Sequence, residues 1–139
     1  MTFPSATVPL FVYGSLRPGM ALWGEIRDHV VESLPGSVRG RLLWHSGMEW
    51  PLLCTADDDS AGKVVGDLLV LTPGDAVNRV IVDEELRYGY DARWLPVSTA
   101  EGEVEAIVLV WHRTTDLGPE ITSGDYAVAV AEIRGTNAR

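Results

Sequence analysis

The sequence predicts an α+β fold, in which a small mixed or mostly antiparallel sheet curls into a barrel-like shape with short helices outside it. Five or six segments have strand patterns, only two or three have helical spacing, and their order is too irregular for a doubly wound sheet. The chain has 139 residues, of which 46% are apolar, so it is long enough to bury a core. We therefore expect one domain over residues 1–139, with a core from about 8 to 133 and a polar tail over 134–139.

The first predicted strand covers residues 8–13, a continuous apolar run typical of a strand buried on both faces. A glycine-rich loop follows it. Apolar residues then recur every four positions from Leu22 to Val30. This spacing predicts a short amphipathic helix over about 20–33, which ends near a Pro-Gly pair.

Alternating apolar residues predict a strand over about 37–44, and the run 63–71 predicts another. Between them, residues 46–60 are irregular and read as a loop that carries Trp50 towards a cavity. Three consecutive aspartates at 57–59 lack the spacing of a calcium-binding EF-hand loop, so we interpret them as a solvated turn.

The second half of the chain predicts a helix, a hairpin and a final helix. Residues 76–86 have helical spacing, with Asp75 as the expected N-cap. Residues 92–98 and 103–112 read as two strands joined by a tight turn. Residues 125–133 are rich in Ala and Val and predict the last helix.

The charge balance excludes several classes of partner. With 20 acidic residues against 11 Lys and Arg, the formal net charge is −9. Nucleic-acid binders gain affinity from clustered basic residues, so we expect neither a nucleic acid nor an anionic membrane as partner. The sequence has no apolar run of the length that crosses a bilayer, and its N-terminus does not resemble a signal peptide, so we expect a cytoplasmic protein.

Metal and disulfide chemistry have little support in the sequence. Cys54 is the only cysteine, which excludes an intramolecular disulfide and a multi-cysteine zinc site. The three histidines, His29, His45 and His112, are far apart and have no metal-binding spacing. We therefore predict no metal site.

The first candidate site is the loop at residues 13–19, Tyr-Gly-Ser-Leu-Arg-Pro-Gly, directly after the first strand. Glycine allows close approach of the backbone to a ligand, and successive N–H groups in such a turn form an anion-binding nest. The spacing matches neither a dinucleotide-binding nor a P-loop motif. The alternative is an ordinary tight turn in which Tyr13 is a core aromatic residue.

The second candidate is the acidic cluster Asp83-Glu84-Glu85 on the second predicted helix. Successive side chains on a helix point about 100° apart, so at most part of the cluster faces the apolar side. A carboxylate in an apolar pocket has a raised pKa and suits proton transfer near neutral pH. The alternative is a solvated face, in which Arg87 or Arg93 pairs with one of the acids.

Several segments together resemble the γ-glutamylcyclotransferase-like superfamily, which includes the avirulence-induced-gene-like family. The loop at 13–19 resembles the family's opening Tyr-Gly-Ser/Thr-Leu motif. Residues 40–43, Gly-Arg-Leu-Leu, and 66–71, Gly-Asp-Leu-Leu-Val-Leu, resemble two of its middle strands. Residues 123–126, Ser-Gly-Asp-Tyr, resemble a segment near its C-terminus. The resemblance covers about residues 8–126.

This resemblance implies an enzyme that cleaves a γ-glutamyl amide by cyclising it to 5-oxoproline, with a small-molecule γ-glutamyl compound as its partner. The substrate's own α-amine is the nucleophile, so the reaction needs no cofactor and one Glu as general acid and base. Glu85 precedes Arg93 by the family's eight positions and is our first choice, with Glu84 in reserve. The resemblance also implies a set of substrate-binding residues: Tyr13, Gly14, Ser15, Leu16, Tyr90, Arg93 and Tyr126.

Two other functions remain open at this point. One is a non-catalytic module that uses the same loop and cavity to bind an anionic metabolite. The other is a hydrolase or acyltransferase in which an external nucleophile replaces the substrate's amine. The sequence leaves open the amine side of the substrate and the oligomeric state.

Overall fold

The computed structural model describes residues 7–48, 50–55 and 62–137. Five strands form a closed barrel in the order β1-β5-β2-β6-β7. Neighbouring strands are antiparallel except for β1 and β7, which close the barrel as a parallel pair. The α+β class and the barrel-like sheet are therefore confirmed. The barrel strands are β1 (Val8–Val12), β2 (Val30–Arg39), β5 (Lys63–Leu71), β6 (Asp91–Thr99) and β7 (Gly102–Val110).

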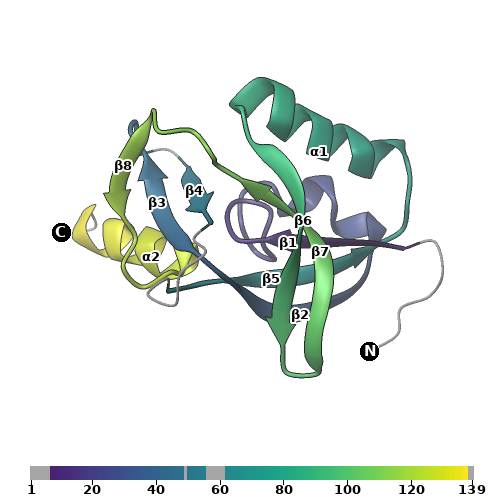
Figure 1. Ribbon diagram of the computed structural model, residues 1–139. Coiled ribbons are helices and arrows are strands. Elements are labelled where there is room, and N and C mark those ends of the chain that lie inside the picture. The colour runs from purple at the N-terminus through teal and green to yellow at the C-terminus, as the bar shows by residue number, and fades with distance from the viewer. Residues whose placement is uncertain (1–6, 49, 56–61, 138–139) are drawn as a thin grey trace.

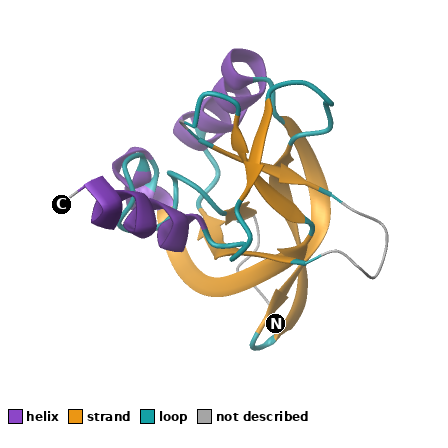
Figure 2. Cartoon of the chain, turned by 90° about the vertical axis from the view of Figure 1, so that its left-hand side faces the viewer, coloured by secondary structure: helices purple, strands orange, loops and turns teal. Residues whose placement is uncertain are grey.

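A second, smaller sheet has the order β4-β3-β8 and stands beside the barrel (Figure 1). Its strands are β3 (Arg41–His45), β4 (Pro51–Cys54) and β8 (Leu117–Glu120). Helix α1 (Asp75–Tyr88) lies above the barrel, and α2 (Tyr126–Asn137) lies against the small sheet on the other side of the molecule. Figure 2 shows the two helices well separated on the outside of the strands.

The barrel core is apolar and continuous with the space beneath the small sheet. Phe11, Leu68 and Val108 are fully buried in one cluster with Trp44 of β3. β1 and β5 pair closely at the end of β1 because residue 66 is glycine, since a Cβ there would collide with the carbonyl oxygen of Val12. The loop that contains the first candidate site begins directly after this point.

The predicted helix over 20–33 is wrong. The chain forms two short 3₁₀ turns, Trp23–Glu25 and Arg27–His29, and then enters β2 at Val30. The apolar spacing arises because Ile26, between the two 3₁₀ turns, is buried, whereas the later apolar residues belong to a strand that pairs with β5 along most of its length. Tertiary pairing overrides local spacing here.

The strand predicted over 37–44 is two strands, because β2 ends at Arg39 and β3 begins at Arg41. The break falls at Gly40, where a Cβ would lie 2.8 Å from the carbonyl oxygen of Cys54. The Pro-Gly pair expected to stop a helix lies inside β2. The missing N–H of Pro35 is tolerated because β2 pairs with β6 only through Gly36 and Ser37.

The loop predicted over 46–60 is wrong in part, because residues 51–54 form β4, which pairs with β3. Strand β8 was not predicted either. The remaining predicted elements are confirmed, with small shifts of their ends. β5 has the predicted bounds, and β6 and β7 form the predicted hairpin. Helix α1 begins at Asp75 itself, with Gly74 as its N-cap. Helix α2 continues to Asn137, into the segment expected to be a polar tail. The three aspartates at 57–59 lie outside the described residues. Among the described residues, no helix is long and apolar enough to cross a membrane.

Candidate active site

A cavity of about 270 Å³ opens where β1 ends. This volume is just below the roughly 300–1,000 Å³ of typical ligand sites, so it suits a small ligand. Its walls come from the end of β1 and the loop after it, the last turns of α1, and the start of β4. The lining residues are Phe11, Val12, Tyr13, Gly14, Ser15, Leu16, Ala21, Leu22, Trp50, Pro51, Glu84, Tyr88, Tyr90 and Leu109.

The loop after β1 is held by its own backbone. The N–H of Arg17 donates to the carbonyl of Gly14 at 3.1 Å, and the N–H of Leu22 donates to the carbonyl of Ser15 at 2.8 Å. Within the described ranges, no protein acceptor takes the backbone N–H of Ser15 or Leu16. Because both residues line the cavity, these amides are suited to bind a ligand oxygen, as the nest interpretation predicts.

Gly14 has a steric role in this loop. A Cβ at this position would lie 2.9 Å from Cγ of Pro51, which lines the same cavity. Such a contact is too short for a carbon pair, so any larger residue pushes the loop and β4 apart. The absence of a side chain at Gly14 therefore brings β4 against the loop.

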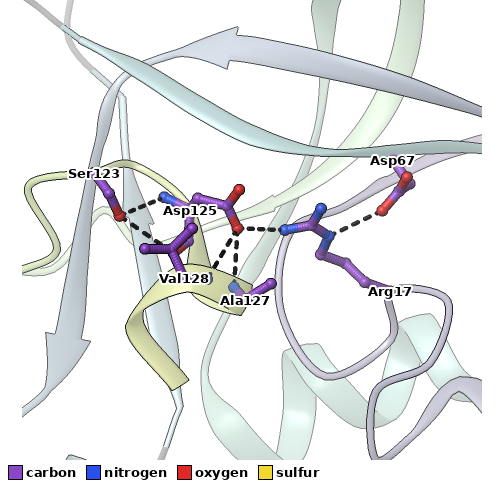
Figure 3. A network of polar contacts seen from close by, with 6 residues as sticks. All are labelled: Arg17, Asp67, Ser123, Asp125, Ala127 and Val128. Carbon is purple, nitrogen blue, oxygen red and sulfur yellow. Dashed lines mark hydrogen bonds and ion pairs between the residues drawn. The ribbon is translucent and has the colours of Figure 1, made fainter. Parts of the chain in front are cut away.

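Arg17 ties the loop to two distant parts of the chain (Figure 3). Its Nε donates to Asp67 of β5 at 2.9 Å, and its Nη1 donates to Asp125 at 2.8 Å. The same Asp125 oxygen accepts the N–H groups of Ala127 and Val128, at 2.9 and 3.4 Å, so it also caps α2. All three charged side chains are less than a quarter exposed. The network therefore joins the loop, the barrel and α2 through one guanidinium.

Glu84 supplies the carboxyl group of the cavity. Burial among apolar side chains, together with the smaller effect of the nearby carboxylates of Asp83 and Glu25, raises its pKa from 4.5 to about 7. At neutral pH the protonated and ionised forms of Glu84 are therefore similarly populated. A group in this state both accepts and returns a proton readily.

The structure brings Glu84, rather than Glu85, to the cavity. Glu84 continues the stripe of α1 that packs on the barrel through Val77 and Ile81. Glu85 is not among the lining residues, and its neighbour Leu86 is 83% exposed. The helix then ends at Gly89, whose left-handed φ of 87° turns the chain into β6.

Two buried tyrosines use their hydroxyl groups to hold the walls. Tyr13 donates to the carbonyl of Leu109 in β7, and Tyr90 donates to the carbonyl of Pro51 in β4. Burial raises the pKa of both phenols well above the ordinary value, so both remain protonated and neutral. These bonds link β1 to β7 and the end of α1 to β4 around the cavity.

Trp50 forms an aromatic side of the cavity, in agreement with its expected place near the opening. Its ring centroid lies 4.4 Å from that of His45 and 5.5 Å from that of Tyr88, which meets it edge to face. Its indole N–H is buried and has no hydrogen-bond partner within the described part of the chain.

Two of the expected site residues lie elsewhere. Arg93 is half exposed and pairs with Asp91 at 2.8 Å, away from the cavity lining. Tyr126 is buried in the core edge to face with Trp44. Tyr13, Gly14, Ser15, Leu16 and Tyr90 all line the cavity as expected.

Sequence reasoning missed the contribution of β4 and the partners of Arg17. Pro51 and Leu109 belong to strands whose sequences carry no sign of a ligand site. Asp67 and Asp125 lie in the segments that resembled family motifs. An arginine in the loop and two aspartates in those segments were the available signal for the network.

Comparison with known protein families shows which family the chain belongs to. The model of the family described as gamma-glutamyl cyclotransferase, AIG2-like, matches residues 10–128. The chain belongs to this family. The match includes the loop, β5, α1 and the cap of α2, which are the parts that build the site. No curated protein sequence matches this chain.

Solved structures of the same fold come from bacteria, archaea and mammals. YkqA from Bacillus subtilis is 19% identical with a TM-score of 0.70; the match covers 93% of this chain but only 43% of YkqA. PH0828 from Pyrococcus horikoshii is 24% identical with a TM-score of 0.62, over 92% of this chain and 97% of its own. An AIG2-like protein from Mus musculus is 20% identical with a TM-score of 0.62, over 76% and 77%. At these identities the similarity establishes the fold.

Proposed function

We propose that this protein is a γ-glutamyl cyclotransferase that releases 5-oxoproline from a small γ-glutamyl amide. The observation that carries the proposal is Glu84, a carboxyl group with a pKa of about 7 in the same cavity as the amides of Ser15 and Leu16. One group suited to proton transfer thus lines the same cavity as donors suited to an oxygen of the γ-glutamyl part. Membership of the cyclotransferase family supports this assignment.

In the proposed reaction, ionised Glu84 takes a proton from the substrate's α-ammonium group. The freed amine attacks the γ-carbonyl carbon, and a new C–N bond closes the five-membered ring. Glu84 then returns the proton to the departing nitrogen as the original amide C–N bond breaks. The attacking nitrogen also loses a second proton, which the released amine takes up. The products are therefore 5-oxoproline and an ammonium ion, and the carboxylate is regenerated.

The protein's contribution in this proposal is orientation and proton transfer. Holding the γ-glutamyl chain in a folded conformation favours an intramolecular attack, which contributes about 7 kcal/mol or more in favourable models. A positioned acid and base contributes roughly 10²–10⁴-fold in rate. A group whose pKa lies near neutral pH is well matched to both proton transfers.

The test is 5-oxoproline release from a panel of γ-glutamyl compounds by wild type, Glu84→Gln and Glu85→Gln. We expect Glu84→Gln to lose roughly 100-fold or more of kcat, because the amide cannot take up the proton. Glu85→Gln is the matched control on the same helix and should retain most activity. Full activity of Glu84→Gln would exclude the assigned role. A folded wild type that binds γ-glutamyl compounds without cleaving them would indicate a binding module instead.

A further inference from the structure

Trp50 combines two properties that no other described residue shares. Its ring lines the cavity together with Glu84. Within the described ranges, its indole nitrogen Nε1 is also the one buried side-chain nitrogen or oxygen that has no hydrogen-bond partner. A buried donor without an acceptor destabilises the folded chain, because it has lost its bond to water and gained no other. Such a donor at the wall of a cavity therefore points to an acceptor that a ligand supplies.

A second tryptophan shows the ordinary arrangement. The indole N–H of Trp111, which is also buried, donates to the carbonyl oxygen of Thr115 at 3.0 Å. Tyr13 and Tyr90, the two buried tyrosines of the cavity, likewise donate to backbone carbonyls. The fold thus satisfies these three aromatic donors and leaves the N–H of Trp50 without an acceptor.

The turn between β3 and β4 holds the indole at the wall of the cavity. The N–H of His45 donates to the carbonyl of Trp50 at 2.9 Å, and the N–H of Met48 donates to the carbonyl of His45 at 2.7 Å. The His45 ring, whose Nδ1 accepts the N–H of Gly47 at 3.1 Å, has its centre 4.4 Å from that of the indole. Tyr88 meets the indole edge to face. A hydrogen-bonded turn and two aromatic side chains therefore fix the place of the ring.

The γ-glutamyl part of the proposed substrate brings two oxygen-bearing groups, the α-carboxylate and the γ-carbonyl. The adjacent backbone amides of Ser15 and Leu16 form a pair of donors, which suits the two oxygens of a carboxylate. The γ-carbonyl oxygen then needs a donor from another part of the wall. It gains negative charge when the α-amine attacks, and a positioned donor in a cavity of low polarity stabilises this charge more than it stabilises the uncharged carbonyl.

We propose that the indole N–H of Trp50 donates to the γ-carbonyl oxygen of the substrate and stabilises the negative charge that this oxygen gains during ring closure. This inference rests on the proposed function. Nε1 has almost no exposed surface, so the bond forms through a small rotation of the indole toward the substrate. The proton stays on the indole throughout, and the charged oxygen becomes a carbonyl oxygen again when the original amide C–N bond breaks.

The first experiment removes the N–H and keeps the ring. 3-Benzothienylalanine at position 50 has a sulfur atom where tryptophan has the N–H, so it fills nearly the same space and cannot donate. We expect kcat for 5-oxoproline release to fall at least tenfold and by as much as roughly 10²–10³-fold, with a smaller change in KM. Trp50→Phe should lower kcat in the same way. Trp94→Phe, at a site that is 60% exposed, is the control and should keep the wild-type kcat.

Stability distinguishes a donor to the substrate from a donor within the fold. The benzothienyl side chain at position 50 should not lower the Tm, because the N–H that it removes has no partner in the described part of the chain. The same side chain at position 111 should lower the Tm, because the carbonyl of Thr115 then loses its donor. Equal losses of Tm at the two positions would show a structural role for the Trp50 N–H and overturn the inference.

The product tests the hydrogen bond directly, because 5-oxoproline keeps both the α-carboxylate and the former γ-carbonyl oxygen. In a proton–nitrogen correlation spectrum of the indole groups, the resonance of Trp50 is assigned by its loss in Trp50→Phe. Saturating 5-oxoproline should move this indole proton downfield, as a new acceptor does. The resonance of the exposed Trp94 should not move.

The outcomes separate this inference from the proposed function. Release of 5-oxoproline by wild type, together with an unchanged kcat in the benzothienyl variant, would overturn the inference and leave the cyclotransferase activity in place. Bound 5-oxoproline that shifts the amides of Ser15 and Leu16 but not the Trp50 indole would overturn it as well. Neither release nor binding by folded wild type would count against the proposed function itself, and the inference would fall with it.

Discussion

Replacing Arg17 by methionine tests the network that fixes the site loop. Methionine keeps an unbranched apolar chain but removes the guanidinium, so Asp67 and Asp125 lose their shared cation. Breaking a fully buried ion pair costs about 3–5 kcal/mol, and exposed pairs are worth about 0–1 kcal/mol. The three side chains are 14%, 18% and 23% exposed, which places this network nearer the buried limit. We expect a loss of about 2–4 kcal/mol in the free energy of unfolding.

The assays are urea unfolding and thermal unfolding, both followed by circular dichroism, with 5-oxoproline release measured in the same preparations. At roughly 3–4 °C per kcal/mol for a chain of this size, the Tm should fall by about 6–16 °C. Arg41→Met is the matched control, because Arg41 also pairs with a carboxylate, Glu120, at 2.6 Å but is 59% exposed. That variant should lose less than about 1 kcal/mol.

A double-mutant cycle isolates the interaction energy between Arg17 and Asp125. Asp125→Asn keeps an oxygen that can cap α2 but removes the charge that faces Arg17. We expect Arg17→Met and Asp125→Asn to be non-additive by about 1 kcal/mol or more. Additive effects, or a loss in Arg17→Met no larger than in Arg41→Met, would refute the view that the network holds the loop.

Three further predictions concern the cavity itself. Because the pKa of Glu84 rises from 4.5 to about 7 on folding, the folded protein binds this proton more tightly, and stability falls as pH rises from about 4.5 to 7. Glu84→Gln removes that loss of stability. At pH 8 its free energy of unfolding should therefore exceed that of wild type by about 1 kcal/mol after allowance for solvent screening, with a higher Tm, and at pH 4.5 the two proteins should be alike. Equal differences at both pH values would contradict this. Gly14→Ala should lower kcat/KM about tenfold or more by displacing β4, whereas Gly24→Ala, with no atom within 4 Å of the added carbon, should be neutral in the same assay. Trp50→Ala should raise KM at least several-fold, whereas Trp94→Ala, at a site 60% exposed, should leave KM unchanged; similar KM values in both would exclude a contact between substrate and Trp50.

Strands were predictable from sequence where the apolar pattern did not also fit a helix. The run of β5 has no helical alternative and came out with its observed ends. The region before β2 failed because apolar residues four apart fit a helix, while the strand's partner lies thirty or so residues further along the chain. Local spacing contains no information about that partner, so the pairing of Leu34 with Leu68 was not derivable.

The choice between the two glutamates shows which sequence signal to trust. Counting eight positions back from Arg93 selects Glu85, but Arg93 belongs to an exposed ion pair on β6. Helical phase gives a different answer. At about 100° per residue, Glu84 lies about 20° from Val77 around the helix, and Glu85 lies about 80° away. The buried position of Val77 on α1 was therefore the better reference.

The place of Tyr126 was beyond sequence reasoning for another reason. Its segment meets the site loop through Asp125, whose side chain binds Arg17, while the tyrosine turns into the core against Trp44. Adjacent residues at a helix start point in different directions, and only the position of α2 relative to the barrel decides which one meets the loop.

The closure of the barrel has a consequence for biosynthesis. β1 leaves the ribosome first, but its two neighbours are β5 and β7, and the parallel pairing with β7 waits until Val108 has been made. The loop after β1 waits longer still, because the carboxylate that completes the hold on Arg17 comes 108 residues later. A nascent or truncated chain that stops before Asp125 thus contains every barrel strand and every residue of the cavity lining, yet Arg17 in the loop after β1 has only one of its two carboxylate partners, Asp67. The part of the site that is synthesised first is fixed last.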